Sequence, residues 1–130
     1  MIILTIRTDK PEAEVGLFDD ETQLHYETWQ AHRELGMTIH QKIAEVLDRA
    51  GKKLEDVQGV VGFQGPGSFT GLRIGLTVAN TLAYARSIPI VAAGGPDWQK
   101  AGIQKIMKGE SDTTALPEYG AEANITKPKK

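Results

Sequence analysis

The sequence predicts an α/β fold, a single lobe in which helices pack on a five-stranded mixed sheet. Three β-rich segments occupy the first 30 residues, and two shorter apolar strands follow, each after a segment with helical periodicity. The element order is therefore βββαβαβ. Hairpins place the first three strands side by side, and right-handed crossovers place the last two beyond the first strand, which gives the strand order 3-2-1-4-5.

The first three strands are predicted at residues 1–6, 12–18 and 22–30. Residues 1–6 are almost continuously apolar, which is typical of a strand covered on both faces. Residues 12–18 alternate acidic or small residues with apolar ones and lead into an acidic turn. Residues 22–30 mix β-forming side chains such as Tyr26 and Trp29 with charged ones, which predicts an edge strand.

Two helices and two strands follow. A helix is predicted at residues 33–50, because apolar side chains recur at spacings of three and four and Gly51 supplies a stop. A strand at 58–63, a glycine-rich loop, a helix at 70–86 and a strand at 88–92 complete the lobe. This layout is that of a ribonuclease-H-like or actin-like lobe.

The lobe is predicted to end near residue 96, with a tail at 97–130. Residues 97–108 form a candidate short helix with Trp98 and Ile103 among its few apolar side chains. Residues 109–130 carry only scattered large apolar side chains, so mostly irregular structure is expected there.

Composition argues against several function classes. The 130 residues carry 15 basic and 17 acidic side chains, a net charge of −2, so a free-standing nucleic-acid-binding protein is not expected. The chain has no cysteine, which excludes disulfides, thiolate metal sites and a cysteine nucleophile. No apolar run is long enough to span a bilayer, and the N-terminus lacks the features of a signal peptide. We therefore expect a cytoplasmic protein without membrane contact.

The most informative motif is the glycine-rich loop at residues 65–71, Gly-Pro-Gly-Ser-Phe-Thr-Gly. A glycine-rich turn between a strand and a helix N-terminus presents backbone N–H groups that suit an anion. The spacing nevertheless fits no Walker A loop, dinucleotide fingerprint or nucleophile elbow. The candidate ligands for an anion or nucleotide are Gly65, Gly67, Ser68, Thr70, Gly71 and Arg73. Helix capping is the alternative role for Ser68 and Thr70, and a plain surface position is the alternative for Arg73.

The helix at 70–86 carries a row of small residues. Gly71, Gly75 and Ala79 follow at intervals of four, although each helical glycine costs about 1 kcal/mol relative to alanine. Such a row indicates that something packs closely against this helix. The helix is also apolar nearly all round, as expected of a helix buried on two sides.

Two interpretations remain open for this helix. Either the helix at 33–50 covers its second side within the monomer, or both helices together present a face to a partner. In the second case the predicted interface residues are His32, Leu35, Ile39, Gly71, Leu72, Gly75, Leu76, Ala79 and Leu82. No metal site and no catalytic residue is predicted, because His32 and His40 have no third ligand at metal spacing.

Residues 63–75, Phe-Gln-Gly-Pro-Gly-Ser-Phe-Thr-Gly-Leu-Arg-Ile-Gly, resemble the signature of the TsaB (YeaZ) family nearly letter for letter. His32 and the stretches 82–84 and 88–91 also match, so the resemblance covers roughly residues 1–95. It implies an actin-like lobe that is not catalytic and that acts as a partner of TsaD in the threonylcarbamoyladenosine modification of tRNA. It further implies contact with TsaD through the two helices, TsaE as a further subunit, and tRNA contact only through the complex. No cofactor of its own is implied, with ATP or ADP shared at the interface with TsaD as the alternative.

The chain departs from that family in two places. Actin-like ATPases begin with a strand that ends in an Asp-Thr pair, whereas the matching residues here are Arg7 and Thr8. Asp9 lies two residues further and points to the same side as Arg7, so it is the alternative acidic group. Independent ATP hydrolysis is therefore not expected.

The second departure is length, because complete relatives have a second lobe after the fifth strand. Residues 117–128 resemble the extreme C-terminus of family members, so we expect a short form that lacks the second lobe and keeps a docking tail. Two rival functions remain: a minimal ATPase that uses the 65–71 loop, and a self-contained homodimeric module outside the tRNA pathway, formed by the same helices.

Overall fold

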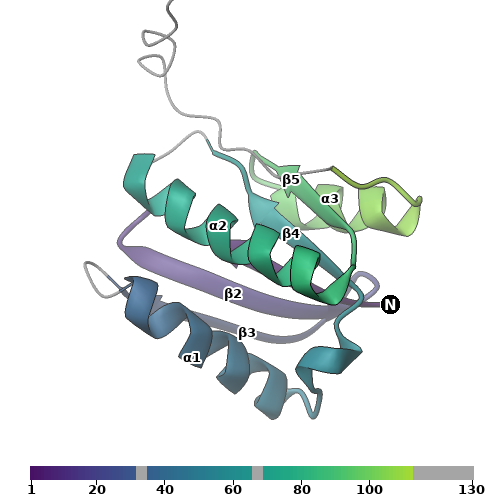
Figure 1. Ribbon diagram of the computed structural model, residues 1–130, viewed down its shortest axis with the longest axis horizontal. Helices are drawn as coiled ribbons and strands as arrows, with labels where there is room; N and C mark the ends of the chain where they lie inside the picture. Colours follow the sequence, from purple (N-terminus) through teal and green to yellow (C-terminus); the bar gives the residue numbers. More distant parts are fainter. Residues whose placement is uncertain (32–34, 66–68, 113–130) are drawn as a thin grey trace, which may run out of the picture.

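The strands form one sheet in the predicted order, β3-β2-β1-β4-β5, which confirms the predicted fold class (Figure 1). The computed structural model describes residues 1–31, 35–65 and 69–112, with residues 69 and 70 described by their backbone alone. The strands are β1 (Ile2–Arg7), β2 (Glu12–Asp19), β3 (Thr22–Gln30), β4 (Gly59–Phe63) and β5 (Ile90–Ala93). β1, β2 and β3 pair antiparallel, whereas β1, β4 and β5 run parallel, so the sheet is mixed.

Within the described residues, three α-helices and one short 3₁₀ turn connect and cover the strands. They are α1 (Leu35–Arg49), η2 (Leu54–Asp56), α2 (Phe69–Arg86) and α3 (Trp98–Met107). The predicted helices at 33–50 and 70–86 are thus observed as α1 and α2. α1 ends where expected, since Gly51 has a φ of +72° and its N–H donates to the Asp48 carbonyl at 3.0 Å.

Helices cover both faces of the sheet. In Figure 1, α1 and α2 lie on the near face and α3 lies behind β4 and β5. Side chains of β1 alternate between the two layers, with Leu4 and Ile6 in the core beneath α1 and α2 and Ile3 in the core beneath α3. This two-sided burial explains why the first strand is continuously apolar.

α3 belongs to the folded lobe, so the predicted boundary near residue 96 does not coincide with the end of the packed structure. Trp98, Ile103 and Ile106 are 3%, 1% and 2% exposed. The Trp98 ring meets the Phe63 ring of β4 edge-on, with centroids 5.5 Å apart. The short apolar stripe of α3 therefore covers the part of the second face that β4 and β5 form. The irregular structure predicted for the tail falls largely on residues 113–130, which lie outside the described residues.

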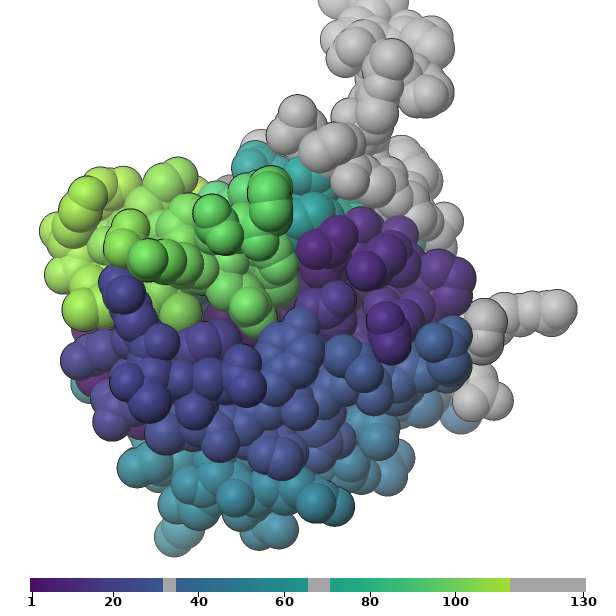
Figure 2. All heavy atoms as spheres, turned by 180° about the vertical axis from the view of Figure 1, so that it is seen from behind, coloured from purple at the N-terminus to yellow at the C-terminus, as the bar shows by residue number. Residues whose placement is uncertain are grey.

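The two edges of the sheet differ. In Figure 2, which shows the molecule from behind, residues of β3 (dark blue) stay at the surface beside α3 (yellow-green). The outer edge of β5 is covered, because the Asp112 N–H donates to the Ile90 carbonyl at 2.7 Å and its carboxylate accepts the Ala92 N–H at 2.8 Å. Such a cap prevents strand addition at that edge. Among the described helices, none has the length and apolar character that a membrane crossing requires.

Candidate functional site

The carboxyl ends of the parallel strands meet the N-terminal end of α2. In sheets of this kind, ligands bind beyond these strand ends. Here the segments after β4 and β5 approach each other closely: the Gln64 N–H donates to the Ala93 carbonyl at 2.7 Å, and a Cβ atom added at Gly94 would lie 2.6 Å from the Gly65 carbonyl oxygen. Gly65 has a φ of +111°, a conformation that requires glycine.

Thr8, at the end of β1, holds the first turns of α2. Its hydroxyl donates to the Gly71 carbonyl at 2.6 Å, and the residue is only 3% exposed. A Cβ atom added at Gly71 would lie 2.1 Å from the Thr8 carbonyl oxygen, and one at Gly75 would lie 2.1 Å from its hydroxyl oxygen. The small residues of α2 therefore permit a close approach to β1 of the same chain.

Arg7 and Asp9 flank Thr8 and form a two-pronged ion pair. The Arg7 Nε and one terminal nitrogen lie 2.7 and 3.2 Å from the two Asp9 carboxylate oxygens. The Arg7 guanidinium also stacks on the Phe63 ring, 3.9 Å from its centroid. The side chains are 21% and 7% exposed, and the hydrogen bonds to Asp9 raise the pKa of Arg7 above its ordinary value. Asp9 is thus neutralised within the chain.

No cluster of three or more potential metal ligands is present within the described part of the chain. His40 is exposed on α1, and His32 lies outside the described residues. The prediction that no metal site is present among His32 and His40 remains a prediction for that reason.

Most predicted interface side chains lie inside the core of this chain. Leu35, Ile39, Leu76 and Ala79 are buried between the sheet and the two helices, and Leu72 is buried in the core shared with α3. Leu82 packs at the margin of the first core. These side chains are used for folding, because the apolar periodicity that singled them out is the periodicity of the core-facing side.

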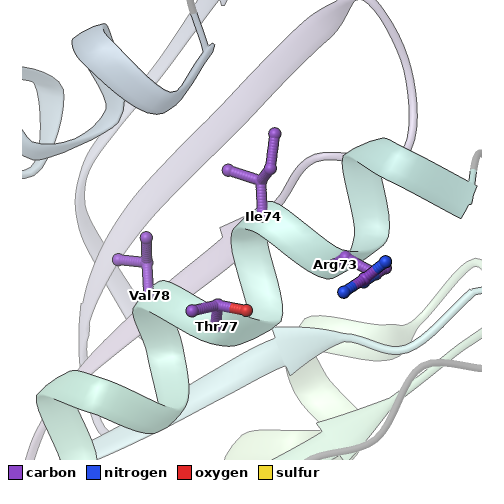
Figure 3. Close-up of a pocket in the computed structure, with 4 residues that line it drawn as sticks. All are labelled: Arg73, Ile74, Thr77 and Val78. Atoms are coloured by element: carbon purple, nitrogen blue, oxygen red, sulfur yellow. The ribbon is translucent and has the colours of Figure 1, made fainter.

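The outer side of α2 carries a groove that the sequence analysis did not identify. Arg73, Ile74, Thr77 and Val78 line a volume of about 330 Å³, and Figure 3 shows how these four side chains project from successive turns. Arg73 and Thr77 are exposed, whereas Ile74 and Val78 continue into the core. The sequence feature that could have revealed this groove is that α2 is apolar nearly all round, whereas a helix with one core-facing side needs apolar residues only on that side.

The glycine-rich loop can be described only in part. Gly65 and Gly71 lie at the strand end and in the first turn of α2, and Arg73 is exposed on the outer side. Gly67, Ser68 and the Thr70 side chain lie outside what the structure describes, so anion binding by this loop stays a prediction.

A second polar cluster lies beside Arg7, on the neighbouring strands β2 and β3. Glu14 is opposite Arg7 in the register of β1 and β2, and it accepts a hydrogen bond from the Tyr26 hydroxyl. Lys10 lies 3.7 Å from the same carboxylate. Burial, followed by the hydrogen bond to Glu14, raises the pKa of Tyr26 above its ordinary value near 10.

This arrangement predicts a pH effect. Because the folded state holds the Tyr26 proton more tightly than the unfolded state, its contribution to stability is present below about pH 10 and is lost as the pH rises further. We expect the melting temperature of the wild type to fall more steeply above about pH 10 than that of Tyr26→Phe. Parallel melting curves for the two proteins between neutral and alkaline pH would contradict this.

Comparison with known proteins identifies relatives. The family model described as TsaD, tRNA N6-adenosine threonylcarbamoyltransferase, matches residues 28–93. The chain is 32% identical to the tRNA threonylcarbamoyladenosine biosynthesis protein TsaB of Escherichia coli K12, over 82% of this chain and 48% of that protein. It is 29% identical to a tRNA N6-adenosine threonylcarbamoyltransferase of Caldicellulosiruptor bescii, over 71% of this chain and 32% of that protein.

A solved structure agrees with these relatives. YeaZ from Pseudomonas aeruginosa superposes with a TM-score of 0.63 and 30% identity, over 72% of this chain and 45% of that one. The chain therefore spans less than half the length of each of these relatives.

Proposed function

Because the chain belongs to the TsaB (YeaZ) family, we propose that it is a non-catalytic partner of TsaD in the formation of threonylcarbamoyladenosine in tRNA. The chain also resembles proteins named as the transferase, so the absence of catalysis needs a separate argument. At the end of the sheet, the Asp9 carboxylate is bound to Arg7 and the Thr8 hydroxyl is bound to Gly71. Neither group is free to act on a substrate.

The observation that carries the proposal is the outer face of α2. This helix holds no acidic residue, and its two charges are Arg73 and Arg86. α1 lies on the same face of the sheet, where Met37 is 81% exposed, and Tyr84 of α2 is 88% exposed. A helix that carries an exposed Tyr84, two arginines and no acidic residue suits a partner surface that is apolar with acidic groups at its rim.

The remaining parts of the proposed assembly follow from the family. TsaE would join the complex, and tRNA would be bound through the complex, in line with the net charge of −2 of this chain. Any ATP or ADP would be held at the interface with TsaD, since this lobe is proposed to have no cofactor of its own. Localisation in the cytoplasm is proposed with this role.

Complex formation with TsaD of the same organism tests the proposal. We expect a stable complex by light scattering on a sizing column, and we expect Thr77→Arg to weaken it about tenfold or more, because the long side chain would fill the groove against which TsaD is proposed to pack. Thr77 is the position of choice because it is exposed and lines the groove.

Thr28→Arg is the matched control, since Thr28 is an exposed threonine on β3. It should leave the affinity unchanged. Equal loss in both variants, or none in Thr77→Arg, would remove the α2 groove from the interface. A wild type that ignores TsaD and runs as a dimer would favour the homodimeric module outside the pathway.

A further inference from the structure

The end of β1 is the place where an actin-like lobe is expected to hold a metal-bound nucleotide, and the residues of this chain do not fit that group. A divalent cation needs oxygen ligands that are not already engaged. The Asp9 carboxylate is bound on both oxygens by Arg7, and the Thr8 hydroxyl donates to Gly71. The close contact between the segments at Gly65 and Gly94 further narrows the space beyond the strands.

Arg7 lies between two acidic side chains. Asp9 is two residues further along the chain and pairs with the guanidinium directly. Glu14 is opposite Arg7 on the neighbouring strand, where Lys10 lies 3.7 Å from its carboxylate and the Tyr26 hydroxyl donates to it. The flat face of the guanidinium rests on Phe63, which in turn contacts Trp98. A buried carboxylate requires such a partner, because an uncompensated charge at this depth is strongly unfavourable.

We propose that the Arg7 guanidinium is a built-in cation at the carboxyl end of β1, which neutralises Asp9 so that this end of the sheet needs no divalent cation and holds no metal–nucleotide complex. The planar guanidinium suits this role because it binds a carboxylate with two parallel hydrogen bonds and stacks on an aromatic ring. The inference concerns this lobe alone and does not depend on its binding to TsaD.

Arg7→Gln is expected to make the stability of the lobe depend on a divalent cation. Removing the guanidinium leaves the buried Asp9 carboxylate without its partner, so the variant should acquire a need for an external cation. With EDTA we expect its melting temperature to lie roughly 5 °C or more below that of the wild type. Magnesium or manganese at about 10 mM should restore part of that loss. The wild type should melt at the same temperature with EDTA, with Mg²⁺ and with Mg²⁺ plus ATP.

Two further variants keep the test decisive. Arg7→Lys retains a cation and should stay indifferent to divalent metal, whereas the double variant R7Q/D9N lacks the carboxylate and should not respond to it. Manganese binding followed by electron paramagnetic resonance gives a direct readout for all four proteins. Stabilisation of the wild type by Mg²⁺ and ATP would overturn the proposal. So would a lack of cation rescue in Arg7→Gln, whether or not that variant folds in EDTA.

Discussion

Replacing Gly71 with alanine is expected to lower the free energy of unfolding by about 3 kcal/mol, a large part of the stability of an ordinary domain. The new Cβ atom would lie 2.1 Å from the carbonyl oxygen of Thr8 and 3.2 Å from its carbonyl carbon. Both are backbone atoms, so no side-chain rotation relieves the contact. Either β1 or the first turn of α2 must move, and the hydrogen bond from the Thr8 hydroxyl to the Gly71 carbonyl is then lost.

Chemical denaturation of Gly71→Ala beside the wild type measures this loss. Gly36→Ala is the matched control, because Gly36 is also helical but a Cβ atom there has nothing within 4 Å. That variant should gain up to about 1 kcal/mol from the better helix propensity of alanine. If Gly71→Ala were as stable as Gly36→Ala, α2 would not pack on β1 as closely as the structure indicates.

The row of small residues on α2 was only partly interpretable from the sequence. The row Gly71, Gly75 and Ala79 predicted a close approach, and the structure contains one. The spacing does not name the element that approaches, and the two alternatives left open for α2 were the helix at 33–50 and a partner chain. The contact is with Thr8, which is 63 residues away from Gly71 in the sequence, and no local pattern encodes that distance.

The strands were predictable for a different reason. Hairpin and right-handed crossover connections leave few topologies for five short strands, and the predicted order 3-2-1-4-5 satisfies both rules. The apolar run at residues 1–6 indicated that the first strand would be covered on both faces, and it is. The short helix predicted at 97–108 is observed as α3, but its packing on the second face was not predicted, since it has few apolar residues and follows a glycine- and proline-containing segment.

The surroundings of Arg7 were also predictable only in part. Alternation along a strand placed Arg7 and Asp9 on one side, so their proximity was foreseeable. The ring beneath the guanidinium comes from β4 and the opposing carboxylate from β2, and only the assembled sheet brings Phe63 and Glu14 to Arg7. The groove on α2 was missed because its two exposed side chains, Arg73 and Thr77, lie between the core positions that the helical periodicity emphasised.

Trp98→Ala is expected to cost about 3–5 kcal/mol of the free energy of unfolding, because it removes a large buried ring from the second core. Trp98 is 3% exposed and meets Phe63 edge-on. The measurement is again equilibrium denaturation, with Met107→Ala as the control, since Met107 is on the same helix and 47% exposed. The control should change the stability by less than about 0.5 kcal/mol. A similarly small effect of Trp98→Ala would mean that α3 is not part of the core.

The same variant separates the two faces of the lobe. α3 and the proposed partner face on α2 lie on opposite sides of the sheet, so Trp98→Ala should weaken folding while its folded fraction still binds TsaD with unchanged affinity. Thr77→Arg should do the reverse, with normal stability and weakened binding.

Phe63 links Trp98 to Arg7, so Trp98→Ala should also loosen the stacked guanidinium. The free energy of unfolding that Arg7→Gln removes should therefore be smaller in the Trp98→Ala variant than in the wild type. Such a difference would show that Arg7 and α3 stabilise one another through the Phe63 ring.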